Sequence, residues 1–342
     1  MFFLCFWVLL SQVSCRQAPP LTGATAHNTE LEMKATIEKV LLYDSLPSAS
    51  GLELLGDQYY VIGDDSPYLY RLDEDYKLLS QVALFDTTGF GATGRIAKSE
   101  KPDLESMTLF QYQGKPYLLM LGSGSSPERR KAFLSNICGD SLCREGSTTK
   151  EVDLDALYKQ LETQEVLGES TLNIEGVAAG HGKLYLLQRA IGSGQNVLIT
   201  FSLGEFIPYL LGESGGRIPK HELAYFRLPE LKNLQAGFSG AFVYDDKLFF
   251  TASLEDTQDA IGDGEVLGSY VGFIPFREIG KQDSLEVPAT LIVQADGKPY
   301  AGKAESLVVK KREGKGRYRL VVVSDDDKGG SELLEISLTA GQ

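Results

Sequence analysis

Short runs of apolar residues alternate with polar positions along most of the chain, and turn-forming residues separate the runs. The stretch after residue 50 is typical. Residues 51–55, 59–63, 68–72 and 78–85 alternate in this way, and Gly56-Asp57-Gln58 lies between the first two. Alternation with a period of two, bounded by turn residues, predicts β-strands joined by tight turns. Four such strands follow one another before the pattern begins again.

A three-residue phrase marks the start of each such group and occurs five times. Its copies lie 55 to 70 residues apart. They are Ser50-Gly51-Leu52, Glu105-Ser106-Met107, Glu175-Gly176-Val177, Ser239-Gly240-Ala241 and Glu305-Ser306-Leu307. Self-similarity at this interval indicates a repeat protein, and a repeated group of short antiparallel strands is the blade of a β-propeller. We therefore predict an all-β propeller.

The two ends of the repeated region complement each other. The last group supplies three strands, at residues 306–310, 317–324 and 331–338, whereas an additional alternating segment at 35–43 precedes the first group. Pairing this N-terminal strand with the last group would remove two open sheet edges. We expect five blades of four antiparallel strands in a single domain over residues 35–342, with six blades as the alternative. Residues 154–166 have helical spacing, and residues 206–220 form an insertion.

The N-terminus has the pattern of an export signal. Phe2–Leu10 is apolar but too short to span a bilayer, and a small residue precedes Cys15. The pattern predicts a signal peptide over residues 1–15, lipidation at Cys15 and a polar tether over residues 16–34. The protein would then be a bacterial lipoprotein on the periplasmic face of the outer membrane, held by its lipid anchor alone. The alternative is an ordinary cleaved signal.

Composition narrows the classes of partner. The formal net charge is −14 and the sequence pI is about 4.8, which argues against nucleic acid as a partner. Cys138 and Cys143 predict a local disulfide in an oxidising compartment. A zinc site is not expected, because there is no second cysteine pair and the three histidines are scattered. We expect a monomer.

Propeller geometry brings distant residues to one face. The first two strands of a blade are antiparallel, so the start of the first strand and the end of the second lie at the same mouth of the central channel. The predicted metal ligands there are Glu105, Glu175, Glu305, Asp64 and Asp325. The predicted ligand-binding residues are Arg129, Arg130, Arg189, Ser50, Ser239, Ser123, Asp65 and Asp256. No catalytic residue is predicted, and His181 is expected in a turn on the opposite face.

Three glutamates around a narrow axis repel one another. At a separation of about 7 Å and an effective dielectric of about 20, each pair costs on the order of 2 kcal/mol. A hard cation would relieve this cost, and the all-oxygen donor set favours Ca²⁺ over Zn²⁺. Two alternatives remain open: one of Arg129, Arg130 and Arg189 neutralises the carboxylates, or the glutamates bind backbone N–H groups between blades.

Two of the phrases carry a family resemblance. Asp103-Leu104-Glu105-Ser106 and Asn173-Ile174-Glu175-Gly176 resemble the Asp-Leu-Glu-Gly phrase of phytase-like esterase domains and related bacterial calcium-binding propellers. Residues 121–130 are similar to a phrase in an uncharacterised bacterial lipoprotein propeller family. The resemblance implies a propeller whose channel is lined at Glu105, Glu175 and Glu305, whereas Ser50 and Ser239 depart from the acidic pattern.

Two functions follow from this sequence. In the first, the protein is a calcium-dependent hydrolase of a small anionic ester or lactone, with arginines that clamp the anion. In the second, it is a non-catalytic module that binds a small anion, a glycan or a protein at the channel mouth and holds a structural cation. The sequence leaves open whether the protein is an enzyme.

Overall fold

Twenty strands of the described part of the chain fall into five groups of four antiparallel strands, which we describe as five sheets. A short parallel pairing joins the fourth and fifth groups edge to edge, and the second and third groups each have a short fifth strand. The computed structural model describes residues 33–87, 95–138, 141–142, 149–192, 194–231, 233–256, 264–280, 285–325 and 330–340. The strands His221–Arg227 and Ser331–Thr339 alternate between buried and partly exposed positions, as the sequence pattern predicts. Others, such as Ala49–Leu55, Ile174–Gly180 and Asn196–Ser202, are instead buried over five or more consecutive residues.

The first sheet consists of β2 (Ala49–Leu55), β3 (Gln58–Gly63), β4 (Tyr68–Leu72) and β5 (Leu78–Ala83). The second consists of β6 (Leu104–Tyr112), β7 (Lys115–Gly122), β8 (Lys131–Cys138) and β10 (Lys150–Asp153). The third consists of β11 (Ile174–Gly180), β12 (Lys183–Gln188), β13 (Asn196–Ser202) and β14 (His221–Arg227).

The fourth sheet consists of β17 (Gly237–Tyr244), β18 (Lys247–Asp256), β19 (Glu265–Pro275) and β21 (Ala289–Val293). The fifth consists of β22 (Lys303–Gly314), β23 (Arg317–Asp325), β24 (Ser331–Thr339) and β1 (Lys34–Tyr43). Short additional strands are β9 (Ser141–Leu142), β15 (Glu230–Leu231), β16 (Leu234–Gln235) and β20 (Leu285–Glu286).

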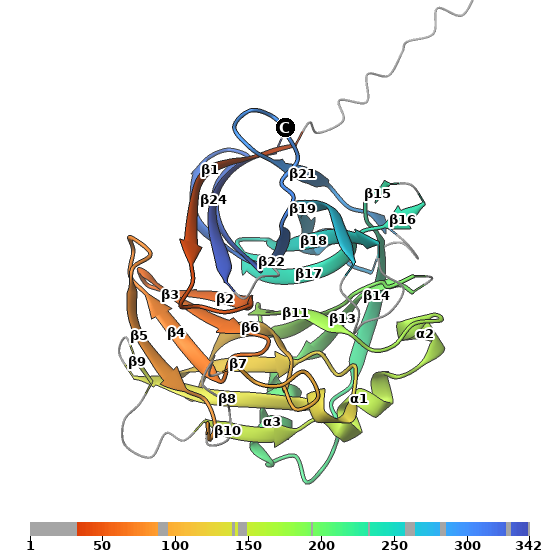
Figure 1. Ribbon diagram of the computed structural model, residues 1–342. Helices are drawn as coiled ribbons and strands as arrows, with labels where there is room; N and C mark the ends of the chain where they lie inside the picture. The colour runs from red at the N-terminus through yellow and green to blue at the C-terminus, as the bar shows by residue number, and fades with distance from the viewer. Residues whose placement is uncertain are drawn as a thin grey trace, which may run out of the picture. The chain divides into compact units, whose positions relative to one another are not determined.

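The innermost strands of successive sheets contact one another in a closed ring, in the order β2, β6, β11, β17, β22 and back to β2 (Figure 1). This arrangement confirms the predicted β-propeller, and we call the five sheets blades 1 to 5. The N-terminal strand β1 pairs with β24 along its length, from Lys34 opposite Thr339 to Tyr43 opposite Ser331. It also pairs in parallel with β21 at Ala35 and Thr36, which joins blades 4 and 5.

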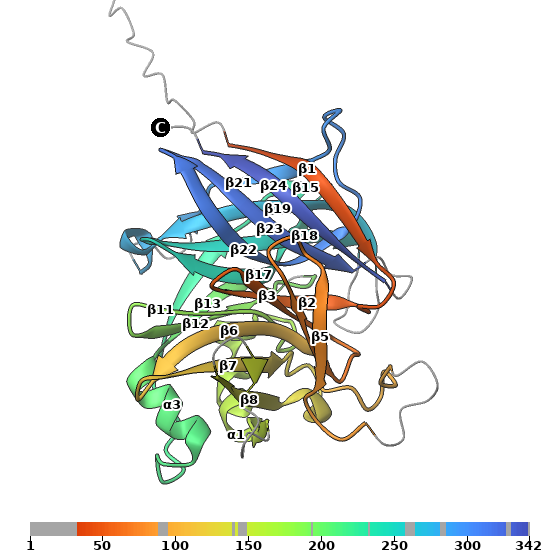
Figure 2. The same cartoon turned by 90° about the vertical axis from the view of Figure 1, so that its left-hand side faces the viewer.

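Within the described residues, three α-helices accompany the blades: α1 (Asp155–Leu161), α2 (Gln164–Leu167) and α3 (Leu203–Leu211). The first two replace the single helix expected over residues 154–166, and α3 begins the insertion after β13. Figure 2 shows α3 at the end of the molecule near blades 2 and 3. None of the helices in the described ranges is long and apolar enough to cross a membrane.

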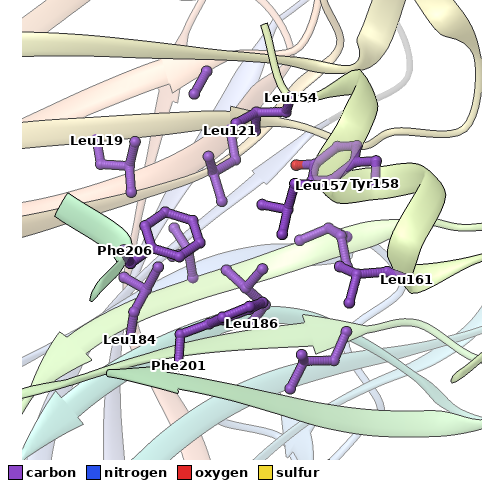
Figure 3. Close-up of a cluster of buried hydrophobic side chains, with 14 of the residues drawn as sticks. Leu119, Leu121, Leu154, Leu157, Tyr158, Leu161, Leu184, Leu186, Phe201 and Phe206 are labelled. Carbon is purple, nitrogen blue, oxygen red and sulfur yellow. The ribbon is translucent and has the colours of Figure 1, made fainter. Parts of the chain in front are cut away.

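Apolar side chains of blades 2 and 3 pack with α1 and α3 into one buried cluster (Figure 3). Leu157, Tyr158 and Leu161 of α1 are fully buried there. The Tyr158 hydroxyl donates to the carbonyl of Gly122 at 2.9 Å. This bond fixes the end of β7, which leads directly into the loop that carries Arg129.

Candidate functional site at the channel mouth

Each repeated phrase forms a β-bulge in the innermost strand of its blade. The pairing register of the first and second strands shifts at the first residue of every copy: Ser50, Glu105, Glu175, Ser239 and Glu305. A bulge leaves one residue outside the ladder and re-aims its side chain. The repeat is therefore a sequence signal for a bulge at the start of each inner strand.

The residue after each bulge is small because the neighbouring blade lies against it. A Cβ atom added to Gly240 would lie 2.5 Å from the backbone oxygen of Glu305. One added to Gly51 would lie 3.3 Å from the Cβ atom of Met107 in blade 2, and 2.7 Å from the side chain of Ile62 within blade 1. At the corresponding place in blade 5, the Ser306 hydroxyl accepts from the Leu52 N–H at 3.2 Å. Close contact between inner strands explains the second position of the phrase.

The three bulged glutamates converge. One carboxylate oxygen from each of Glu105, Glu175 and Glu305 lies within 4.8 Å of the others. Glu175 and Glu305 are 5% exposed, and Glu105 is partly exposed. Residues that are 70 and 130 positions apart in the sequence, counted from Glu105 to Glu175 and from Glu175 to Glu305, thus meet at one point. We call this set the glutamate triad.

Two buried cations lie beside the triad. Arg189, at the end of β12, contacts Glu255 at 2.7 Å and Glu175 at 3.5 Å. Lys303, at the start of β22, contacts Glu305 at 3.0 Å and Glu255 at 3.6 Å. Although burial raises the pKa of Glu255, the two cations lower it to about 2. Arg189 thus contributes the neutralisation that the sequence left open as an alternative to a metal ion.

The triad nevertheless retains unpaired oxygens. In Glu175, Oε1 accepts from the Asn173 side chain at 2.6 Å, whereas Oε2 is buried and has no hydrogen-bond partner. In Glu305, Oε1 contacts Lys303 and Oε2 is likewise buried without a partner. A buried carboxylate oxygen without a donor is costly. The local cations therefore satisfy only one side of each carboxylate.

The pKa values of two of the three glutamates are raised in consequence. Burial, opposed by Lys303 and assisted by Glu175, raises the pKa of Glu305 to about 8. Burial, Asp103 and Glu175 raise the pKa of Glu105 well above its usual range. Without further positive charge, the triad would take up protons at neutral pH.

A second carboxylate set adjoins the first and shares Glu105. Oxygens of Asp64, Asp103 and Glu105 also lie within 4.8 Å of one another. The Lys101 ammonium contacts Asp64 and lies 2.7 Å from Asp103. The buried Arg129 guanidinium contacts Asp103 at 2.6 Å. We call this set the aspartate cluster.

The two bulged serines join blades. The Ser50 hydroxyl donates to the carbonyl of Leu104 in blade 2, and the Ser239 hydroxyl donates to the carbonyl of Ala304 in blade 5 at 2.6 Å. Each bond ends at the residue before the next bulged glutamate. Both hydroxyls are therefore engaged in holding adjacent inner strands together.

The other predicted residues divide between the cluster and its surroundings. Ser123 donates to Asp103, and Asp65 pairs with Arg95. Arg130 binds Asp155 and Glu162, in and after α1. Asp325 ends β23 opposite Lys303, and Asp256 is exposed at the end of β18.

The three arginines proposed to clamp an anion are all paired with carboxylates in this structure. These pairs occupy the forked donors that an anion would need, so the geometry gives the clamp no support. Cys15, Cys143 and the Cys138 side chain lie outside the described residues, so lipidation and the disulfide stay predictions. His181 lies in the β11–β12 turn, at the ends of the strands away from Glu175, and its Nε2 is 2.8 Å from the carbonyl oxygen of Asp245.

Sequence reasoning predicted Arg129 and Arg189 but missed the two lysines of the mouth, Lys101 and Lys303. Lys101 precedes Glu105 by four residues and Lys303 precedes Glu305 by two, on the segments that enter the bulges. A lysine just before the acidic phrase in blades 2 and 5 was the available signal. Glu53 was also missed. It lies in β2, and its carboxylate accepts backbone N–H groups from Leu54 at 2.9 Å and Leu109 at 2.8 Å.

Several solved structures resemble this fold. They include glutaminyl cyclase of Myxococcus xanthus, at 13% identity and a TM-score of 0.46, over 91% of this chain and 99% of that chain. An α-L-arabinanase of Cellvibrio cellulosa matches at 14% identity and a TM-score of 0.45, over 86% and 90%. The PQQ-bound aldose sugar dehydrogenase of Streptomyces coelicolor matches at 11% identity and a TM-score of 0.44, over 90% and 99%. We draw nothing about activity from likeness at this level.

None of the curated proteins gives a significant match to the chain. The three solved structures named above are propeller-like proteins and are not phytase-like domains of the kind that the sequence phrases resemble. A family model covers residues 45–338, which include the whole glutamate triad and the aspartate cluster. The protein therefore belongs to DUF6929, a family of unknown function.

Proposed function

We propose that this propeller binds a divalent cation, Ca²⁺, at the mouth of its channel through Glu105, Glu175 and Glu305. The observation that carries the proposal is the pair of buried, unpartnered Oε2 atoms of Glu175 and Glu305 within a carboxylate triad. Oxygens within 4.8 Å of one another match a central ion at the Ca²⁺–oxygen distance of about 2.3–2.6 Å.

The charge of the surroundings supports the same ion. Around the triad and the aspartate cluster, the six carboxylates are Asp64, Asp103, Glu105, Glu175, Glu255 and Glu305, and the four cations are Lys101, Arg129, Arg189 and Lys303. When all are ionised, two negative charges remain in excess. One divalent ion would balance this group, and in its absence protons would have to do so.

The chemistry of the donors favours calcium among divalent ions. All three ligands are carboxylates, which suit hard cations, and no cysteine or histidine among the described residues joins the cluster. Ca²⁺ takes about six to eight oxygen ligands, so three glutamates leave positions for water or a bound molecule. We infer that these open positions face an oxygen-rich ligand and that the protein is a binding module.

Hydrolysis is the second candidate, and the same open positions favour it. A bound metal ion polarises a substrate oxygen and lowers the pKa of a coordinated water. The ordered arginine pairs weigh against the anion clamp that this mechanism would use. A panel of phosphate esters and lactones, tested with and without Ca²⁺, separates the two candidates, since a binding module turns over none of them.

The proposed cellular setting is compatible with weak calcium binding. We propose that the chain is exported and anchored through a lipid on Cys15 in a bacterial envelope. Calcium sites of extracellular modules commonly have Kd values of about 10⁻⁴–10⁻³ M.

Replacing Cys15→Ala should move the protein from the membrane fraction to the soluble fraction of a host that processes lipoproteins. Retention in the membrane fraction would contradict the anchor.

Thermal melting tests the cation site directly. The wild-type protein should melt several degrees higher in Ca²⁺ than in chelator, since a ligand at about 100 times its Kd adds about 3 kcal/mol to the folded state. Glu105→Gln, Glu175→Gln and Glu305→Gln should each lose most of this shift. Glu53→Gln, another buried glutamate of an inner strand, is the matched control and should keep it. A wild-type protein whose melting ignores Ca²⁺ would refute the proposal.

A further inference from the structure

Two carboxylate sets meet at the channel mouth, and both retain buried oxygens without a hydrogen-bond partner: Oδ1 of Asp64 in the aspartate cluster, and Oε2 of Glu175 and of Glu305 in the glutamate triad. The glutamate triad and the aspartate cluster share Glu105, and both bring three carboxylate oxygens within 4.8 Å of one another. By ligand type and spacing alone, each could hold a metal ion. Two ions that share a carboxylate ligand are a recognised arrangement, with the ions about 3.5–4 Å apart.

The aspartate cluster already contains a cation. Lys101 places its Nζ atom against Asp64 and 2.7 Å from Asp103, and its side chain is only 10% exposed. Arg129 holds the other oxygen of Asp103 at 2.6 Å. Although burial lowers the pKa of Lys101, Asp103, Asp64 and Glu105 raise it above its usual range, which keeps the ammonium charged.

The glutamate triad differs in this respect. Arg189 joins Oε1 of Glu175 to Glu255, and Lys303 joins Oε1 of Glu305 to Glu255, so each cation bridges one triad member to a carboxylate outside the triad. The Oε2 atoms of Glu175 and Glu305 remain without partners. The Lys101 ammonium therefore lies between two members of the aspartate cluster, whereas Arg189 and Lys303 each contact one member of the glutamate triad. Because the two sets share Glu105, this difference bears on how many metal ions can bind at the mouth.

We infer that Lys101 is a built-in cation that occupies the second ligand set and limits the channel mouth to one divalent ion. The inference rests on the proposed function, because it assumes that the glutamate triad binds the first ion. An ammonium carries half the charge of Ca²⁺ and is fixed to the chain, so it neutralises the aspartates with less repulsion toward the neighbouring ion. The open coordination positions of the one bound ion then stay available to a ligand.

Calcium titration by calorimetry tests this assignment, with chelator-stripped protein and CaCl₂ as the probe. The wild-type protein should bind one ion per chain. Lys101→Met, which keeps the length of the side chain and removes its charge, should bind two. Lys101→Arg should bind one. Lys159→Met, which removes an exposed lysine paired with Asp155 in α1, is the matched control and should also bind one.

The outcomes separate this inference from the proposed function. One ion in both the wild-type protein and a folded Lys101→Met variant overturns the role of Lys101 and leaves the calcium site standing. No ion in the wild-type protein overturns both. Two ions in the wild-type protein overturn the inference without any variant, so the test holds even where Lys101→Met does not fold. Circular dichroism in the same buffers establishes that each titrated protein is folded.

Discussion

At the scale of single residues, two buried glutamates of the inner strands have opposite surroundings. Glu175 faces other carboxylates and keeps one oxygen unpaired, whereas the Glu53 carboxylate accepts backbone N–H groups from blades 1 and 2. A cation would balance the charge around Glu175. Glu53 instead shows the bonding to backbone N–H groups between blades that we considered as an alternative for the other glutamates. We therefore propose different roles for identical side chains on equivalent strands.

Glu53 should make the stability of the protein depend on pH. Burial, opposed by the N–H groups of Leu54 and Leu109, raises its pKa to about 7. Between the usual value and about 7, the folded state holds a proton that the unfolded state has released, so stability falls as pH rises through this window. The loss is on the order of 3 kcal/mol.

Urea denaturation at several pH values between 4.5 and 8 measures this effect. In saturating Ca²⁺, which keeps the glutamate triad ionised, the unfolding free energy of the wild-type protein should decline across the window. Glu53→Gln should remove this component of the decline. Equal pH slopes for the two proteins would show that Glu53 does not titrate there.

A second prediction at this scale concerns Glu305. In chelator near pH 9, Glu305→Gln should match or exceed the stability of the wild-type protein, because it removes a charge that burial and Glu175 disfavour. In Ca²⁺ the same variant should be less stable than the wild-type protein, because it lacks one ligand. Paired melting curves in the two buffers measure both differences, and a variant less stable in both would indicate that the carboxylate has no cation-dependent role.

At the scale of elements, the bulge that begins each inner strand links the repeat to the site. It directs Glu105, Glu175 and Glu305 to one point and requires a small residue next to it. Gly240 shows the constraint most clearly, since an added Cβ would meet the backbone of the next blade at 2.5 Å. Gly204, in the first turn of α3, has no atom closer than 3.6 Å to such a Cβ.

These two glycines give opposite predictions for the same substitution. Gly240→Ala should destabilise the protein by about 1–3 kcal/mol, because the backbone of blade 5 must move. Gly204→Ala should be neutral or stabilising by up to about 1 kcal/mol, because alanine favours helix. Chemical denaturation of both variants provides the measurement, and equal effects would contradict the close packing of the inner strands.

At the scale of the whole molecule, strands from both ends of the chain complete blade 5. β1 pairs with β24, and the seam between blades 1 and 5 carries further contacts. Lys310 in β22 lies 2.8 Å from the Tyr76 hydroxyl and 3.3 Å from Glu335 in β24. Closure of the ring is what holds the three glutamates at a common point.

Removing β1 should therefore prevent both correct folding and Ca²⁺ binding at the glutamate triad. A fragment of residues 45–342 exposes the edge of β24 and the apolar side chains of blade 5, so we expect aggregation and no cooperative melting. A fragment of residues 31–342 keeps β1 and should fold and bind Ca²⁺. Size-exclusion chromatography and melting curves compare the two, and a monomeric, cooperatively melting shorter fragment would refute the role of this closure.

The fold was largely predictable because period-two alternation and the repeated phrase are local signals. The convergence of the glutamates was also predictable, because propeller geometry relates equivalent positions in different blades. The pairing of Arg129 with Asp103 and of Arg189 with Glu255 was not, since neither partner belongs to the repeated phrase and the contacts depend on side-chain packing. The helices α1 and α2 were anticipated as one segment because the turn between them carries only a weak sequence signal.

Anomalous diffraction from crystals of the full chain grown in Ca²⁺ would locate the ion. We predict one peak within about 2.3–2.6 Å of carboxylate oxygens of Glu105, Glu175 and Glu305. We also predict that the Lys101 ammonium remains between Asp64 and Asp103. Well-ordered density for the three glutamates with no peak between them, or with a peak only elsewhere, would contradict a calcium site at the channel mouth.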